Sequence, residues 1–220
     1  MLVYLSRMSR QTRPNSSLGR PANPEARANR REQILAGAER CFVRKGFHAS
    51  TTAEISAEAG VSVANMYQYF PTKDDLIRAL IQADLAEELD LVRLVNEADT
   101  LAEGLERTIR LSTTGPENLS SLSLRLEILA EAARNPRIAA EVCEADAQMT
   151  AAVADMIARR QQAGEVSADI KPGPAAELIL SLFDGMIGRL AFADSDPEAL
   201  ARAATHLILA GLGVTRRPVN

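Results

Sequence analysis

The most distinctive chemistry in the sequence lies between residues 51 and 73. Gln68 can form two hydrogen bonds with the edge of an adenine base, and the small apolar side chains of Val63 and Ala64 can contact a thymine methyl group. Helical spacing places these three residues on one face of a short helix. Lys73, just beyond it, is a cation that could bind a phosphate oxygen. Together these residue types predict a surface that reads the major groove of double-stranded DNA.

Two short helices joined by a tight turn are expected to hold that surface. Thr51 and Glu54 form a capping-box pattern that predicts a helix over 52–59, and Ser62 is expected to cap the second helix. Gly60 between them can adopt the positive φ that a tight turn requires. The N-termini of both helices also present N–H groups that favour phosphate oxygens. The pattern is that of a helix-turn-helix, although such a helix pair can also serve only as packing in an all-helical protein.

Charge is divided unevenly along the chain. The whole sequence has a net charge of −4, but residues 1–78 carry 12 Lys and Arg against 7 Asp and Glu, and the remaining residues carry 13 against 22. The first part is therefore net +5 and the second net −9, an asymmetry that predicts a polyanionic partner for the basic part. A hydrophobic content of 46 % excludes a disordered chain, and no apolar run is long enough to suggest a membrane span.

The sequence contains no recognisable catalytic or metal-binding pattern. Its two cysteines, Cys41 and Cys143, and its two histidines, His48 and His206, have no partner at a metal-ligand spacing. No phosphate-binding glycine loop and no nucleophile motif occur. We therefore predict no catalytic site, no metal site and no cofactor, and a protein of the reducing cytoplasm.

Apolar residues at helical spacing predict an all-α protein. We expect a flexible basic arm over 1–26, a three-helix N-terminal helix-turn-helix DNA-binding domain over 27–72, a helical ligand-binding and dimerisation domain over 73–214, and a tail over 215–220. Residues 122–128 alternate strictly and could form a strand. A helical stripe also fits them, and no second strand is available to pair with them, so the helix is favoured.

The acidic second part could use its apolar surface to line a ligand cavity. The candidate lining residues are Leu122, Leu126, Met149, Val153, Met156, Phe183 and Met186. An ordinary filled core is the simpler interpretation of each of them taken singly. Charged residues beside these stripes, among them Arg125 and Asp184, could orient a polar ligand or simply face solvent.

Residues 47–76, FHASTTAEISAEAGVSVANMYQYFPTKDDL, resemble the DNA-binding signature of the TetR family of transcriptional regulators. The preceding RREQILAGAERCFVRKGF is similar to the first helix of that family, so the likeness covers Arg30–Leu80. Its most specific features are Gly46-Phe47, Ala59-Gly60-Val61-Ser62, Tyr67, Phe70 and Lys73-x-x-Leu76. The segments EAARNP, AGEV and FDGMIGRL resemble the C-terminal subgroup named for the choline-responsive repressor of betaine synthesis, which does not make choline the ligand.

The resemblance implies which residues contact DNA. It assigns Thr52, Ser62, Tyr67, Tyr69 and Lys73 to the phosphate backbone, and Val63, Ala64, Asn65 and Gln68 to the base edges or their neighbourhood. Val63, Ala64 and Gln68 stand where the family often has other residues, so the operator sequence cannot be transferred from relatives. Tyr69 replaces a frequent histidine and keeps a hydrogen-bonding tip.

The resemblance also implies a dimer and an effector. The last two helices, expected over 175–191 and 197–211, would form a four-helix interface with a second copy through Leu178, Leu182, Gly185, Leu207, Ile208 and Gly211. The expected function is a homodimeric repressor that a small-molecule effector releases from a pseudo-palindromic operator, with the helix over 73–92 linking the two parts. The alternatives are a DNA-binding regulator or architectural protein without small-molecule control, and an all-helical enzyme.

Overall fold

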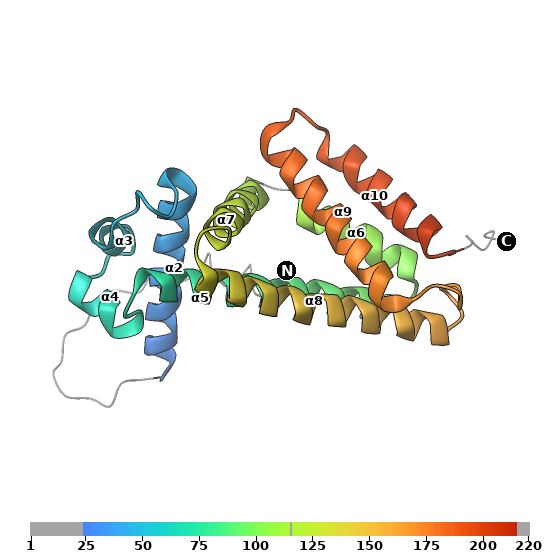
Figure 1. Ribbon diagram of the computed structural model, residues 1–220, viewed down its shortest axis with the longest axis horizontal. Coiled ribbons are helices and arrows are strands. Elements are labelled where there is room, and N and C mark those ends of the chain that lie inside the picture. The colour runs from blue at the N-terminus through green and yellow to red at the C-terminus, as the bar shows by residue number, and fades with distance from the viewer. Residues whose placement is uncertain (1–23, 115, 215–220) are drawn as a thin grey trace.

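The computed structural model describes residues 24–114 and 116–214, which form α-helices joined by turns (Figure 1). The helices are α2 (Pro24–Lys45), α3 (Thr52–Glu58), α4 (Val63–Tyr69), α5 (Lys73–Glu97), α6 (Leu101–Thr113), α7 (Pro116–Ala132), α8 (Pro136–Gln162), α9 (Pro172–Phe192) and α10 (Pro197–Gly211). Within these described residues there is no strand, and the alternating segment 122–128 lies inside α7. The predictions of an all-α fold and of a helix at this segment are therefore confirmed.

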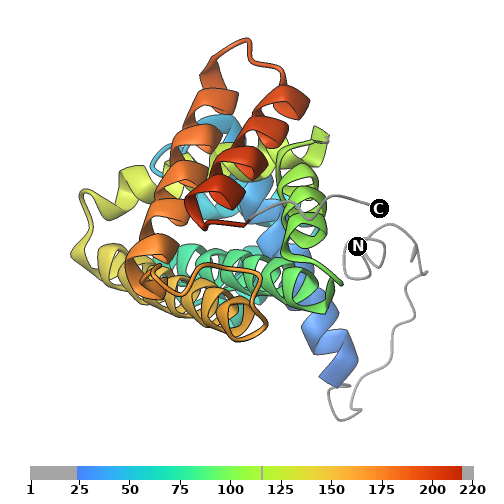
Figure 2. The ribbon, with the colours of Figure 1, turned by 90° about the vertical axis from the view of Figure 1, so that its right-hand side faces the viewer.

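A small head and a larger body lie at opposite ends of the molecule (Figure 1). α2, α3 and α4 form the head, and α5 leads from the head along α8 into the body. In the body α8 also packs on α9, and α10 packs on α6. Figure 2 shows α9 and α10 lying side by side at the outside of the body. One long helix therefore connects the head with a helical bundle.

Local hydrogen bonds begin the helices of the head where the sequence predicts. Thr51 Oγ1 accepts the N–H of Glu54 at 3.2 Å, and the Glu54 carboxylate accepts the N–H of Thr51 at 3.0 Å. Ser62 caps α4 by accepting the N–H of Asn65 at 3.1 Å. Gly60 has a φ of +64°, in the left-handed region that favours glycine. The predicted capping box, second cap and glycine turn are all confirmed.

Two hydrophobic cores hold the molecule together. The first lies in the head and is built around Phe42, Ile55 and Met66, all of them buried. Ile128 of α7 and Ile138 of α8 belong to this core as well. The second core fills the body between α5, α6, α8, α9 and α10. Because α7 and α8 contribute to the head core, the head is packed against the body and does not hang on α5 alone.

Several element bounds differ from the predicted ones. α5 continues beyond residue 92 to Glu97, because Val95 is also buried. α9 begins at Pro172 and not at the predicted residue 175, since proline is favoured in the first turn of a helix. α2 begins at Pro24, inside the predicted arm; the rest of that arm, 1–23, and the predicted tail, 215–220, lie outside the described residues. Within the described ranges no helix combines the length and apolarity needed to cross a membrane.

Candidate nucleic-acid interface and effector cavity

Packing contacts fix the inner side of α4 against the rest of the head. Met66 is fully buried, and the Ser56 hydroxyl of α3 lies 3.4 Å from its sulfur. Gln33 of α2 donates a 2.6 Å hydrogen bond to the carbonyl of Ala59, one residue before the Gly60 turn. α2 and α3 therefore hold α4 from one side only, which leaves its other side for a partner.

The outer side of α4 presents the residues that helical spacing predicts. Val63 is 39 % exposed, Tyr67 is 44 % exposed, and Ala64 and Gln68 are also exposed. The side-chain amide of Asn65 donates a 3.3 Å hydrogen bond to the side-chain oxygen of Gln68. This bond orients Gln68 and leaves its NH₂ group for an acceptor on a base edge. The face is therefore small and apolar at its start and polar at its end.

The residues assigned to phosphate contacts come from both short helices. The Tyr67 hydroxyl lies 3.5 Å from the Thr52 hydroxyl, so α3 and α4 meet at this point. Ser62 uses its oxygen as the α4 cap and keeps its hydroxyl proton for donation. Hydroxyl groups at the first turns of helices, beside backbone N–H groups, suit the binding of phosphate oxygens.

Lys73 is tied to the loop that precedes α3. Its Nζ donates hydrogen bonds to the carbonyl of Phe47 at 2.6 Å and of Ser50 at 3.0 Å, and lies 4.3 Å from the centre of the Phe47 ring. Burial lowers the pKa of Lys73, while the carboxylates of Glu131 and Asp74 oppose that change. Two of its three N–H groups are used inside the head, so one remains for a phosphate. Lys73 therefore also holds the loop before α3 against the start of α5, a structural role that the sequence did not indicate.

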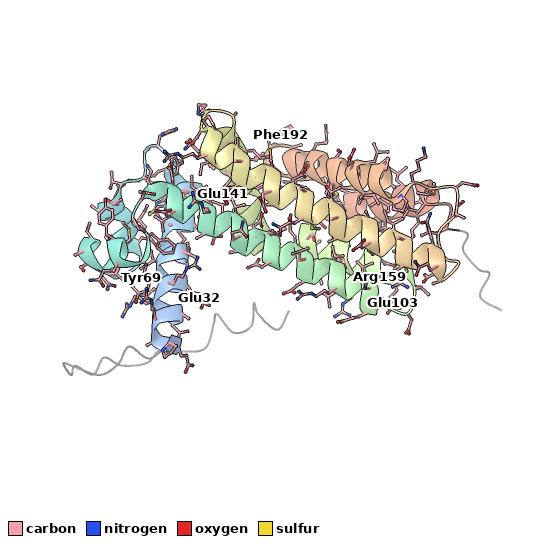
Figure 3. All side chains as sticks on the ribbon, turned by 60° about the horizontal axis from the view of Figure 1, so that its bottom comes forward. Glu32, Tyr69, Glu103, Glu141, Arg159 and Phe192 are labelled. Atoms are coloured by element: carbon pink, nitrogen blue, oxygen red, sulfur yellow. The ribbon has the colours of Figure 1, made fainter. Side chains whose placement is uncertain are left out.

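Two arginines of α2 that the sequence reasoning did not assign to DNA lie beside the end of α4. The guanidinium of Arg27 lies 5.7 Å from the ring centre of Tyr69, and that of Arg31 lies 5.3 Å from the ring centre of Phe70. Figure 3 shows Tyr69 on the head, at the end of the molecule away from Arg159. The i, i+4 spacing of the two arginines was the available signal. They place positive charge next to Tyr69, a residue assigned to phosphate.

A cavity of about 240 Å³ lies between α5, α7, α8 and α9. Its lining residues are Ile81, Asp84, Leu85, Glu88, Arg125, Ile128, Leu129, Val142, Cys143, Ala145, Asp146, Met149, Leu180 and Asp184. Of the seven predicted lining residues, Met149 alone belongs to this set. Leu126 is exposed, Leu122 is buried, Val153, Met156 and Met186 are buried in the core of the body, and Phe183 packs against that core. The filled-core interpretation therefore applies to Val153, Met156 and Met186.

Arg125 connects the charged groups of the cavity. Its guanidinium contacts the carboxylates of Glu88 at 2.5 Å, Asp184 at 3.0 Å and Asp84 at 3.5 Å. These residues come from α5, α7 and α9, so one ionic cluster joins three walls of the cavity. Arg125 and Asp184 were both predicted as residues that could orient a polar ligand, and both line the cavity.

α7 contacts the cavity on one side and the head on the other. The Glu127 carboxylate accepts the N–H of Phe47 at 3.2 Å, and Glu131 lies 2.9 Å from Nε2 of His48. Ile128, on the turn between them, belongs to the head core and also lines the cavity. A displacement of α7 by a ligand would therefore reach the loop that leads into α3.

The predicted dimer residues divide between the surface and the core. Four of the six are exposed: Leu178, Gly185, Leu207 and Gly211. Leu182 is half-buried, and Ile208 is buried in the body core and has little surface left for a second copy. Phe192, which was not among the predicted dimer residues, is 80 % exposed. It lies at the end of α9 (Figure 3).

Comparisons with known proteins match both parts of the chain. The N-terminal model of the tetR family of bacterial regulatory proteins matches residues 34–80, and the C-terminal model of BetI-type transcriptional repressors matches residues 101–213. The HTH-type transcriptional repressor Rv1474c of Mycobacterium tuberculosis is 33 % identical over 175 residues, which cover 79 % of this chain and 88 % of that protein.

Solved structures share the fold. GusR of Salmonella enterica has a TM-score of 0.73 and 26 % sequence identity, with 87 % of this chain and 96 % of that chain covered. A transcriptional regulator of Saccharomonospora viridis, solved in complex with choline, has a TM-score of 0.72 and 23 % identity, with 86 % of this chain and all of that chain covered. The second likeness shows the fold alone.

Proposed function

The chain belongs to the tetR family of bacterial regulatory proteins, and we propose that it is a homodimeric repressor that a small-molecule effector releases from a pseudo-palindromic DNA operator. The relative Rv1474c is an HTH-type transcriptional repressor. The observation that carries the proposal is the outer face of α4, which ends in an oriented amide at Gln68 and has two arginines of α2 beside its end. This function requires a cytoplasmic protein, because bacterial DNA lies in the cytoplasm.

Gln68→Ala is expected to relax sequence preference at one base-pair position and to weaken operator binding by roughly 1–3 kcal/mol. The reason is that Gln68 offers the amide best placed on α4 to pair with a base edge. The operator is first selected from random duplexes by the wild-type protein and sequenced. Fluorescence anisotropy then gives the affinity of each protein for that duplex and for its single-base variants.

A matched control for this prediction lies on α8. Gln148→Ala removes an exposed side-chain amide of the same kind from a helix outside the head and should leave both the selected sequence and the affinity unchanged. If Gln68→Ala keeps the wild-type preference at every position, the assignment of α4 as the reading helix is wrong. If the wild-type protein selects no duplex, the proposed function fails.

An apolar surface on α9 and α10 supports the dimer. Leu178 is 72 % exposed and Leu207 is 60 % exposed, so each of the two helices presents a large apolar side chain to a second copy. The two helices are antiparallel neighbours, so the start of α9 lies beside the end of α10 (Figure 2). A Cβ added at Gly185 or Gly211 would meet nothing within 4 Å, so a second backbone could approach there. In such a dimer two α4 helices would enter major grooves about 34–36 Å apart.

Leu178→Lys combined with Leu207→Lys is expected to convert the dimer to a monomer, because two charges per copy would be buried at the interface. Sedimentation velocity measures the mass, and operator affinity should fall with it. Leu111→Lys, on α6, makes the same change at another exposed leucine and should leave the dimer intact. A wild-type protein that sediments as a monomer at micromolar concentration would contradict the proposed assembly.

The contacts of α7 support regulation by an effector. A ligand in the cavity would touch α7 at Ile128, one residue from Glu127, which bonds to the head. α5 begins with Lys73 in the head and lines the cavity with Asp84 and Glu88. Effector and operator affinities would then be reciprocally coupled, by about 1–3 kcal/mol in ordinary cases.

A further inference from the structure

The cavity between α5, α7, α8 and α9 has more negative than positive groups. Asp84, Glu88, Asp146 and Asp184 line it, and Arg125 is the one cation among its described lining residues. With every group ionised, three negative charges are in excess. Such an excess of negative charge around a cavity attracts a cation and repels an anion.

The guanidinium of Arg125 is already engaged. It contacts Glu88, Asp184 and Asp84, which leaves Asp146 without an ion pair to any described residue. An anionic ligand could reach Arg125 only by displacing carboxylates and would then face them unpaired. A cationic ligand could use Asp146 at once and share the carboxylates that Arg125 holds.

The remaining lining residues decide which kind of cation fits. They are aliphatic or sulfur-containing side chains, and no aromatic ring occurs among the described residues of the lining. A quaternary ammonium has no N–H and binds best against aromatic faces, which this cavity does not offer. A protonated amine can instead donate hydrogen bonds to carboxylates. At about 240 Å³ the cavity suits a small ligand.

We propose that this cavity binds a small aliphatic cation with N–H donors, a primary or secondary ammonium or an amidinium, held by the carboxylates of α5, α8 and α9. The identification of this ligand as the effector rests on the function proposed above. Binding itself does not rest on that function. The ammonium lies at the carboxylates, and the aliphatic chain lies against residues such as Leu85 and Leu180.

The ionisation of Glu88 gives the site a pH dependence. Burial raises the pKa of Glu88 to about 6, and the charges of Asp84 and Asp184 add to this rise against the opposing charge of Arg125. The titratable and charged groups around Glu88 are Asp84 on α5, Arg125 on α7, Cys143 and Asp146 on α8, and Asp184 on α9. Below its pKa Glu88 is neutral and attracts a cation less. Ammonium affinity should therefore fall as the pH drops through about 6.

Calorimetric titration of the full chain with four matched probes tests the proposal. Hexylammonium carries N–H donors, hexyltrimethylammonium carries the same chain and charge without them, hexanoate is the anion, and hexanol is neutral. We expect hexylammonium to bind at least about tenfold more tightly than the other three at neutral pH. Equal or tighter binding of the quaternary ammonium or of hexanoate, or no binding of hexylammonium, overturns the proposal.

Variants locate the site of binding. Asp146→Asn removes the unpaired carboxylate and should weaken hexylammonium binding severalfold, and Glu88→Gln should weaken it and reduce its pH dependence near 6. Asp155→Asn makes the same change at an exposed position of α8 outside the cavity and should have no effect. Because Asp146 is exposed and unpaired, its variant is expected to fold normally. Unchanged binding in both cavity variants places the ligand elsewhere and overturns the proposal.

Operator affinity, measured with and without hexylammonium, separates this proposal from the proposed function. Binding that weakens operator affinity supports both. Binding in the cavity that leaves operator affinity unchanged supports the ligand class and counts against this ligand class as the effector. Operator release by a probe that does not bind in the cavity overturns the cavity as the effector site.

Discussion

Gly37→Val is expected to unfold the head and to abolish operator binding while the body stays helical. Gly37 lies within α2, and a Cβ built there would lie 2.9 Å from the Cβ of Ala59, 3.0 Å from its N and 3.1 Å from its Cα. Two of these atoms belong to the backbone of Ala59, the residue that follows α3, so no side-chain rotation can relieve the contact. Overpacking at such a site costs up to about 3 kcal/mol, and more when backbones must separate. α3 would be displaced and would carry α4 with it.

Gly37→Ala tests the same contact by the sign of its effect. In an open helix interior, replacing glycine by alanine stabilises the fold by roughly 0.5–1 kcal/mol. Here the close approach of Ala59 should outweigh that gain and lower the free energy of unfolding, which urea denaturation followed by circular dichroism measures. Gly173→Ala, in the first turn of α9 with nothing within 4 Å, is the matched control and should not destabilise. A stabilising effect at both positions would show that α3 does not contact α2 this closely.

Gly37 shows what the sequence could not provide. The pattern of apolar residues predicts the helix around it, but a glycine inside a helix appears there only as a local weakness. A glycine is needed there because α2 approaches Ala59, 22 residues later, very closely. That contact exists only in the assembled fold. By contrast, the capping box of Thr51 and Glu54 was predictable because it joins residues three positions apart. So was the exposed face of α4, which follows from helical periodicity.

The cavity was hard to predict for the same reason. Apolar stripes such as Val153 and Met156 mark residues that are buried, and in this fold they fill the body core. The residues that line the cavity include Arg125 and carboxylates that lie 37, 41 and 59 positions from it. Which of them meet depends on how α5, α7 and α9 are spaced. A sequence pattern identifies a helix face, whereas a cavity is a property of the gap between several helices.

Arg159 and Arg160 are adjacent residues of the same type that the sequence cannot distinguish, although the structure places them differently. Arg159 and Arg160 both lie in the last turn of α8, where either could pass for a solvated charge. Arg159 is exposed, and Figure 3 shows it at the end of the molecule away from the head. Arg160 is buried: it donates hydrogen bonds to the carbonyls of Val95 at 2.5 Å and Ala98 at 2.9 Å, and pairs with Glu165 at 2.6 Å. It therefore satisfies the backbone at the end of α5.

Arg160→Met is accordingly expected to lower the free energy of unfolding of the body by about 3 kcal/mol, because two carbonyls and one carboxylate would lose their donor. Methionine retains much of the apolar stem, so the loss reports the polar contacts more than the packing. Urea denaturation measures the change, and Arg159→Met, with the same loss of charge one residue away, should cost less than about 1 kcal/mol.

Equal effects of the two substitutions would show that the contacts of Arg160 contribute nothing beyond its charge. A large effect confined to Arg160 would instead show that its hydrogen bonds to Val95 and Ala98 help to anchor the far end of α5. Such an anchor is what α5 needs if a ligand at its middle is to move its head end and leave its far end in place.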